Sequence, residues 1–134
     1  MELVVTKQQA KVPVTVYRIT GDIDGNSYRL LENQAKTDIE AGARFILLDM
    51  TDVGYVSSAG LRTFHWIYAR LSEEEATAEA AKQRSAGLRD GTYKSPHLKL
   101  YKPSKRVVQA MSLAGYDMFL ESFDDFQTAL DSFG

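Results

Sequence analysis

The sequence contains no cysteine, two histidines and three prolines among its 134 residues. Without cysteine, the chain cannot form a disulfide, use a thiol as a nucleophile or bind zinc through sulfur. Two histidines leave little for any other metal site, and we expect neither a metal nor a cofactor. No apolar run approaches the roughly 18 residues of a membrane-spanning helix, and the opening segment MELVVTKQQAKV lacks the apolar core of a signal peptide. These absences predict a cytoplasmic protein that is not inserted into a membrane.

The sequence also lacks a strong charge of either sign. Its 16 basic and 18 acidic residues give a net charge of −2, whereas nucleic-acid-binding domains usually carry a large basic excess. We therefore expect no direct nucleic-acid partner. The content of 44% apolar and 25% charged residues excludes a disordered or collagen-like chain. A length of 134 residues is typical of one domain, so we expect a single domain over residues 1–134.

Hydrophobic patterns predict strands and helices that alternate along the chain. Val12, Val14 and Val16 recur at every second position, which predicts a half-buried strand over 12–20. The unbroken apolar run at 45–48 is typical of a central parallel strand. Weaker patterns predict strands near 3–6, 98–101 and 118–120, and helices near 27–39, 58–71, 107–114 and 123–133. This alternation predicts an α/β fold with a mixed, mostly parallel sheet of about five strands, packed by about four helices, whose opening strand pair is antiparallel.

Residues 72–95 interrupt this rhythm. The segment holds nine charged residues and almost no apolar ones. Its first part, SEEEATAEAAKQRSA, is rich in helix-forming residues. We interpret the segment as a charged insert that extends the preceding helix into solvent and ends in a loop. A specialised contact with a partner is the alternative interpretation.

The sequence offers little for catalysis. The G-x-S-x-G spacing of a nucleophile elbow is absent, and so are the glycine-rich phosphate-binding motifs GxxxxGK[ST] and GxGxxG. His65 follows Ser58 by seven residues on the same predicted helix, about 10 Å away by the helical rise. That distance is too long for His65 to activate the hydroxyl of Ser58. We therefore predict that the protein is not an enzyme.

The loop between residues 49 and 60 is the most informative stretch. It joins a buried strand to an amphipathic helix, and we expect Ser58 to be the N-cap of that helix. Ala59 and Gly60 are small, so we expect the helix start to be open to a close approach. A helix N-terminus favours negative charge, and a phosphoryl group on Ser58 would add about −1.5 to −2 charges at an exposed point. The residues alone leave a phosphorylation switch and a plain cap open as alternatives.

Side chains further along this helix, and in an earlier turn, are additional candidates. Trp66 points away from the apolar stripe of the helix, so it is either an interface anchor or packed under the charged insert. Arg62 and His65 flank the same end of the helix and are either partner contacts or ordinary surface residues. The carboxylates of Asp22 and Asp24 lie in a turn, where capping and solvation explain them without catalysis.

Several segments, taken together, resemble the STAS domain family. The run LLDMTDVGYVSSAGL at 47–61 resembles the family's hydrophobic strand and the loop D-x-S-x-V-x-x-x-D-S-S-G-L that follows it. Other landmarks follow in order: Gly21–Asp24 resembles the G-x-L/I-D turn, Pro103–Val107 the start of the third helix, and Met111–Tyr116 its end. The resemblance covers nearly the whole chain apart from the charged insert. It implies the STAS-like α/β sandwich.

The family includes the anti-sigma factor antagonists of bacteria. In these proteins, a serine at this helix start is phosphorylated by a protein partner, an anti-sigma factor with serine kinase activity. The unphosphorylated antagonist binds that kinase and frees the sigma factor, the phosphorylated form lets go, and a phosphatase resets the switch. The resemblance implies that Ser58 is the phosphorylated serine. Ser57, which stands where the family usually has aspartate, is a second candidate.

The resemblance also implies a partner-binding surface and leaves a second function open. The surface comprises Asp22, Asp24, Ser57, Ser58, Ala59, Gly60, Arg62 and Trp66. Other STAS domains are small subunits of lipid-transport ATPase complexes, and these dock through the same loop and helix. A constitutive STAS subunit of a membrane ATPase complex is therefore the alternative function.

Overall fold

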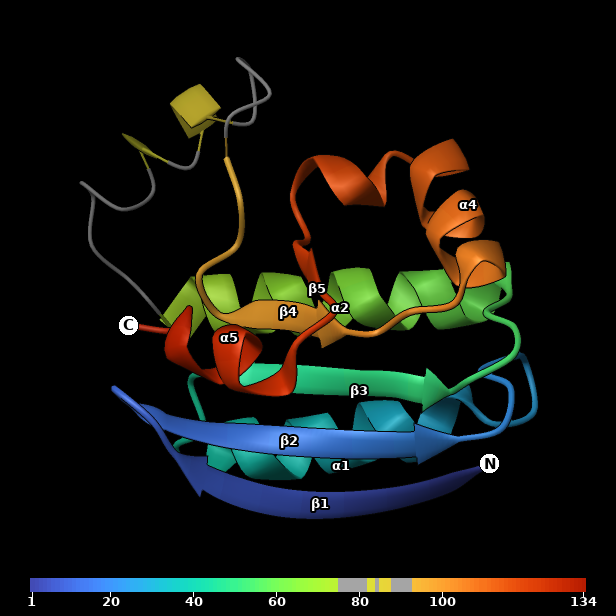
Figure 1. The fold of residues 1–134 in the computed structure, drawn as a ribbon, viewed down its shortest axis with the longest axis horizontal. Helices are drawn as coiled ribbons and strands as arrows, with labels where there is room; N and C mark the ends of the chain where they lie inside the picture. The colour runs from blue at the N-terminus through green and yellow to red at the C-terminus, as the bar shows by residue number, and fades with distance from the viewer. Residues whose placement is uncertain (75–81, 84, 88–92) are drawn as a thin grey trace.

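The computed structural model describes residues 1–74, 82–83, 85–87 and 93–134. Figure 1 shows a five-stranded sheet flanked by helices. The strands are β1 (Glu2–Gln9), β2 (Pro13–Thr20), β3 (Ile46–Asp52), β4 (Leu98–Tyr101) and β5 (Ser122–Phe123). The helices are α1 (Tyr28–Glu40), α2 (Ser58–Glu74), α4 (Lys105–Leu113) and α5 (Phe126–Asp131), with a short 3₁₀ helix, η1 (Tyr116–Met118). The alternation of strands and helices confirms the predicted α/β class.

The strands of the sheet are arranged in chain order, β1-β2-β3-β4-β5. β1 and β2 form an antiparallel hairpin in which Glu2 lies opposite Thr20 and Gln9 lies opposite Pro13. The three remaining strand pairs are parallel, which confirms the predicted mixed sheet. Each parallel pair is joined by a crossover that contains a helix. As a result, the carboxyl ends of β2, β3 and β4 meet at one end of the sheet.

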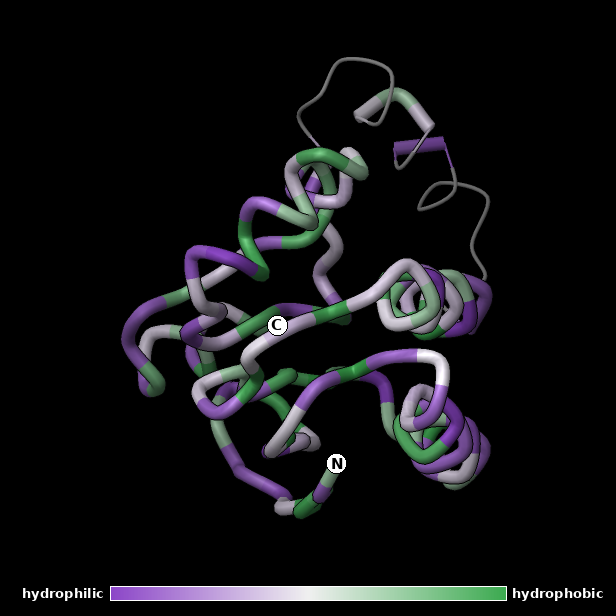
Figure 2. The backbone as a smooth tube through the Cα atoms, turned by 90° about the vertical axis from the view of Figure 1, so that its right-hand side faces the viewer, coloured by the Kyte–Doolittle hydropathy of each residue, from purple (hydrophilic) through white to green (hydrophobic). Residues whose placement is uncertain are grey.

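Helices cover both faces of the sheet. Figures 1 and 2 show α1 and α2 side by side on one face, with the main core between them and the strands. Tyr17, Ile46 and Phe64 are fully buried in that core. α5 lies on the opposite face, where Leu47 and Phe133 belong to a second, smaller core. The site described below lies at the carboxyl end of the sheet, where both α1 and α2 begin.

β2 is buried on both faces, which differs from the half-buried strand predicted by the alternating valines. Val14 and Val16 face the small core under α5, whereas Tyr17 and Ile19 face the main core. The alternation treated Tyr17 as a polar position. Its ring is apolar, however, and its hydroxyl donates a hydrogen bond to Asp38 in α1, so the residue can be buried without leaving a polar group unpaired.

A buried lysine holds α5 against the sheet. Lys99 in β4 is 5% exposed, and its Nζ donates to the carbonyl and hydroxyl oxygens of Ser132, at 3.1 and 3.0 Å. Burial lowers the pKa of Lys99 below its usual value, and the carboxylate of Glu121, 3.9 Å away, partly opposes this shift. The ring of Phe133, whose centroid lies 5.1 Å from Nζ, completes the contact.

The last strand lies later in the chain than predicted. Met118 is the last residue of the 3₁₀ helix η1, residues 119–120 follow it, and β5 is formed by Ser122 and Phe123. Gly115 adopts a left-handed conformation, with φ of 80°, between α4 and η1. The chain then joins the sheet where the amides of Leu100 and Lys102 donate to the carbonyls of Glu121 and Phe123. A strand of two residues is too short to produce a readable hydrophobic period.

The charged insert is only partly described. Residues 72–74 continue α2, in keeping with the predicted extension of that helix. Most of the remaining segment lies outside the described residues. In the part of the chain that the structure describes, no helix combines the length and apolar character needed to cross a lipid bilayer.

We expect Phe133→Ala to destabilise the protein, because Phe133 is fully buried and packs edge-on against Phe45 at 5.9 Å between ring centroids. The free energy of unfolding, measured by urea denaturation, should fall by about 3–5 kcal/mol. Leu113→Ala is the matched control, because Leu113 is 91% exposed and its loss should change stability by less than about 0.5 kcal/mol. Equal effects of the two substitutions would contradict the packing of α5 described here.

Candidate functional site

The candidate site is built where two loops meet at the carboxyl ends of β2 and β3. One is the turn at 21–27, which leads into α1, and the other is the loop at 53–57, which leads into α2 (Figure 1). Ile23 and Val56 form a parallel bridge. The amide of Ile23 donates to the carbonyl of Tyr55 at 3.0 Å, and the carbonyl of Ile23 accepts from the amide of Ser57 at 2.9 Å. These backbone hydrogen bonds fix the start of α2 against the turn.

Ser57 is the N-cap of α2, so the prediction that Ser58 is the cap is wrong. The carbonyl of Ser57 accepts from the amide of Leu61 at 2.9 Å, which is the first hydrogen bond of the helix. The Ser57 hydroxyl accepts from the amide of Gly60 at 3.4 Å. The helix therefore starts one residue earlier than expected, because Ile23 holds the backbone at Ser57 and leaves Ser58 as the first helical residue.

The two neighbouring serines consequently differ in accessibility. Ser57 is half-buried, and its amide and hydroxyl are both engaged. Ser58 is exposed, and its hydroxyl makes no hydrogen bond to the residues that the structure describes. The positive end of the α2 dipole lies at the same point. A negatively charged group on Ser58 would therefore meet favourable electrostatics without displacing an existing contact.

Gly60 is buried, and its missing side chain makes room for the chain itself. A Cβ atom at this position would lie 2.7 Å from the carbonyl oxygen of Ile23 and 2.7 Å from Cγ1 of Val56. We expected Gly60 to open the helix start to an approaching molecule, and the structure instead places the turn at Ile23 in that space. Ala59, beside it, is half-buried.

The two aspartates of the turn have different surroundings. The side chain of Asp24 accepts from the amide of Asn26 at 2.9 Å, and its carbonyl accepts from the amide of Tyr28 at 2.9 Å. Asp24 therefore shapes the entry into α1, in agreement with the capping interpretation. The carboxylate of Asp22 is exposed and lies close to Gly54, where a Cβ atom would be 3.3 Å from Oδ1.

A groove of about 190 Å³ separates α1 and α2 beside this helix start. It is lined by Tyr28, Glu32, Ala59, Arg62, Thr63 and Trp66. Trp66 is half-buried and lies next to α1, and the guanidinium of Arg70 lies 5.6 Å from the centroid of its ring. Arg62 and Trp66, one turn apart on α2, therefore share one groove with Ala59.

His65 does not belong to this groove. Its ring lies 5.9 Å from that of Tyr68, 6.2 Å from that of Tyr116 and 6.3 Å from that of Phe119, measured between centroids. It therefore joins an aromatic cluster with the segment after α4. The structure separates His65 from Arg62, although the sequence placed them at the same end of the helix.

Sequence reasoning missed a contact between Tyr55 and Arg106. Tyr55 precedes the helix start and is 40% exposed, and the guanidinium of Arg106 lies 4.9 Å from the centroid of its ring. Arg106 follows β4, and the carboxyl ends of neighbouring parallel strands lie side by side. That rule was the signal that could have placed Arg106 near the site. Among the described residues, no group of three histidine, cysteine, aspartate or glutamate side chains could hold a metal ion.

We expect Gly60→Ala to destabilise the protein, although alanine is the better helix former by about 1 kcal/mol. The new methyl group would lie 2.7 Å from a backbone carbonyl that Ser57 holds in place, so the net loss should be about 1–3 kcal/mol in urea denaturation. Gly25→Ala is the control, because nothing lies within 4 Å of its Cβ position. A Gly60→Ala protein as stable as the wild type would disprove the close approach.

Comparison with solved structures supports the fold. A Thermotoga maritima protein considered an anti-sigma factor antagonist is 16% identical, with a TM-score of 0.69 over 88% of this chain and 85% of that one. An anti-sigma factor antagonist from Mycobacterium paratuberculosis is 16% identical, with a TM-score of 0.65 over 96% of this chain and 92% of that one. At these identities the likeness shows the fold alone.

The antagonist SpoIIAA of Bacillus resembles the chain in both of its forms. The unphosphorylated form is 12% identical, with a TM-score of 0.62 over 95% of this chain and 92% of that one. The phosphorylated form is 13% identical, with a TM-score of 0.60 over 93% of this chain and 96% of that one. No curated protein sequence matches the chain.

The family is shown by sequence as well. The model of the STAS domain matches residues 4–78, which are 75 of the 134 residues. The matched residues include β2, α1, β3, α2 and both loops of the candidate site. The chain belongs to the STAS domain family.

Proposed function

We propose that this protein is a non-enzymatic regulatory domain, an anti-sigma factor antagonist that binds an anti-sigma factor with serine kinase activity. Phosphorylation of Ser58 by that kinase releases the antagonist, and a phosphatase restores binding. The setting of this cycle is the bacterial cytoplasm. The observation that carries the proposal is the exposed hydroxyl of Ser58, which has no hydrogen bond to the described residues and lies at the first position of α2.

The chemistry assigns separate roles to the two proteins. The Ser58 oxygen attacks the γ-phosphorus of ATP held by the kinase, ADP leaves, and the hydroxyl proton passes to a base. That base belongs to the kinase, because His65 packs among the rings of Tyr68, Tyr116 and Phe119, away from the groove. The antagonist contributes a fixed, accessible hydroxyl and a helix N-terminus that favours the phosphate formed.

Ser57 fits this proposal although the family usually has aspartate at that position. Aspartate, asparagine and serine are about equally good N-caps. Ser57 accepts the hydrogen bond from Gly60 that an aspartate would accept, so the substitution preserves the start of the helix. Its engaged hydroxyl makes Ser57 the weaker acceptor for phosphate and favours Ser58.

The proposed partner surface surrounds Ser58 and extends into the groove between α1 and α2. Asp22 supplies an exposed carboxylate on one side, and Arg62 and Trp66 supply a cation and a large ring on the other. Arginine and large aromatic side chains are enriched at the centres of protein interfaces. Ser57, Asp24 and Gly60 support the surface by shaping the turn and the helix start.

Phosphorylation is proposed to act through surface charge. Backbone hydrogen bonds join Ile23 to both Tyr55 and Ser57, so a phosphate on the outward-facing Ser58 changes little inside the domain. A partner that has desolvated this point would instead meet about −1.5 to −2 additional charges. The resemblance to SpoIIAA in both its unphosphorylated and phosphorylated forms supports a fold that accommodates such a change.

We expect Ser58→Asp to weaken binding to the anti-sigma factor kinase by about tenfold or more, because it introduces a negative charge into a desolvated contact. Ser58→Ala should bind like the wild type, since the hydroxyl makes no hydrogen bond within the described residues. Calorimetric titration against the purified kinase measures both. Ser112→Asp is the control, because Ser112 is an exposed residue of α4 outside the proposed surface, and it should retain binding. Equal affinity of the Ser58→Asp and Ser58→Ala proteins would reject the switch.

We also expect phosphate on Ser58 in protein isolated from its own cells. Trypsin should release residues 45–62 as one peptide that contains both candidate serines, and fragmentation in the mass spectrometer distinguishes them. Phosphate on Ser57 alone would reject Ser58 as the acceptor. A peptide that stays unmodified in every growth condition, together with stable co-purification with an ATPase, would support the constitutive transport subunit instead.

A further inference from the structure

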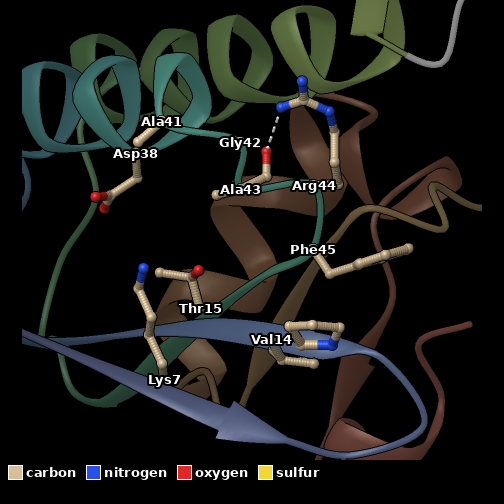
Figure 3. Close-up of a pocket in the computed structure, with 10 residues that line it drawn as sticks. Lys7, Val14, Thr15, Asp38, Ala41, Gly42, Ala43, Arg44 and Phe45 are labelled. Atoms are coloured by element: carbon tan, nitrogen blue, oxygen red, sulfur yellow. Dashed lines mark hydrogen bonds between the residues drawn. The ribbon is translucent and has the colours of Figure 1, made fainter.

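A second cavity lies at the far end of α1 from Ser58, near the amino ends of β2 and β3 (Figure 3). Its volume is about 310 Å³, and the carboxyl end of α1 and the strands β1 and β2 contribute to its lining. Small-molecule sites in proteins range from about 300 to 1,000 Å³. The size therefore suits a small metabolite.

Arg44 lines this cavity, but its guanidinium group is already paired within the protein. One guanidinium nitrogen donates to the carbonyls of Ile39 at 3.0 Å and Ala43 at 2.8 Å. The other donates to the carboxylate of Glu74 at 3.3 Å. Arg44 thus satisfies carbonyl groups that the end of α1 would leave unpaired. It is a structural residue, and the recognition of a ligand falls to other groups.

Asp38 offers one carboxylate oxygen to the cavity. Its Oδ2 accepts from the hydroxyl of Tyr17 at 2.5 Å and from the amide of Gln34 at 3.0 Å. Burial, and then the hydrogen bond to Asp38, raise the pKa of Tyr17, so its hydroxyl remains a neutral donor. The Oδ1 atom of Asp38 accepts no hydrogen bond from the described residues. The nearby carboxyl end of α1 adds to the negative potential at this point.

Lys7 lines the same cavity, and its positive charge is unpaired among the described residues. Figure 3 shows the Lys7 side chain extending toward the side of the cavity where Asp38 lies, with Thr15 beside it. The hydroxyl of Thr15 makes no hydrogen bond with the described residues either. A cation, an anion and a hydroxyl thus line one side of a cavity without contacting one another.

The opposite side of the cavity is apolar. Pro13, Val14 and Phe45 line it, and the ring of Phe45 is held by stacking on His97 at 5.3 Å between centroids. A molecule that matches the whole lining carries a positive and a negative group close together, next to a hydrocarbon or aromatic side chain. An α-amino acid with an apolar side chain has that structure.

We propose that this cavity binds an apolar α-amino acid in its zwitterionic form. The ligand carboxylate pairs with Lys7, the ligand ammonium donates to Oδ1 of Asp38 and to the hydroxyl of Thr15, and the ligand side chain packs against Val14 and Phe45. The site is independent of the proposed phosphorylation at Ser58, because the two lie at opposite ends of α1 and share no lining residue.

Calorimetric titration of the full chain with L-phenylalanine and L-leucine tests the proposal. N-acetyl-L-phenylalanine lacks the ammonium group, and L-phenylalaninamide lacks the carboxylate. We expect both derivatives to bind about tenfold more weakly than the free amino acid, because each loses one charge-assisted hydrogen bond. Equal affinity for the amino acid and either derivative would overturn the assignment of a zwitterion site.

Substitutions in the chain provide the second arm. Lys7→Gln and Asp38→Asn should each weaken binding of the better amino acid by about tenfold. Lys36→Gln is the matched control, because Lys36 is an exposed residue of α1 that does not line the cavity, and it should leave affinity unchanged. Full affinity in the Lys7→Gln protein would exclude the proposed pairing.

Asp38→Asn also disturbs the hydrogen bond to Tyr17, so nuclear magnetic resonance of the wild-type chain provides a measurement that needs no variant. Amide shifts on titration with L-phenylalanine should concentrate at Lys7, Thr15 and residues 41–45. Two outcomes would overturn the proposal. One is a set of amide shifts confined to other parts of the domain. The other is no shift and no heat at about 10 mM ligand, which is well above a weak Kd of about 1 mM.

Discussion

The backbone of Ile23 is bonded at both its amide and its carbonyl to the loop that precedes α2. Its side chain is fully buried, and its carbonyl oxygen occupies the space that a side chain on Gly60 would need. The position of the first turn of α2 depends on this contact, because backbone groups on both sides of it are satisfied only in this register. Under the proposed function, a partner would therefore bind this surface in the shape that the folded domain already has.

This rigidity explains why neighbouring serines have different roles. The residue whose amide is bonded to Ile23 becomes the cap, and the next residue begins the helix and turns outward. Nothing in the dipeptide itself distinguishes Ser57 from Ser58, since either serine is a good cap. The prediction of the cap failed because the choice is made by a turn more than 30 residues earlier in the chain, which places one backbone carbonyl in reach.

The parts of the fold that could be predicted are set by residues that lie near one another in the sequence. The unbroken apolar run ending at Leu48 and the periodic stripe that includes Phe64 are both visible in short stretches of sequence, and the order of strands and helices follows from such patterns. The second buried face of β2, which carries Tyr17 and Ile19, could not be predicted, because the residues that cover it come from other elements, among them Ile39 of α1. The contact between Tyr55 and Arg106 depends likewise on two strands becoming neighbours. The family resemblance pointed to the candidate site, whereas the burial of Gly60 and the packing of Trp66 next to α1 required the structure.

Different hydrogen bonds hold the two ends of α1 in place. These contacts affect how a ligand or a phosphate would act at each proposed site. Asp24 and its turn hold the start of the helix next to the proposed partner surface, and Arg44 holds its carboxyl end beside the cavity. A ligand that binds the folded state stabilises it by RT ln(1 + [L]/Kd), about 2.7 kcal/mol at a hundredfold excess over Kd. It changes affinity for a partner only if two states differ in their affinity for the ligand. Because both ends of α1 are held in place, an amino acid in the cavity would raise the amount of folded protein, while phosphate on Ser58 would set the affinity for the proposed partner.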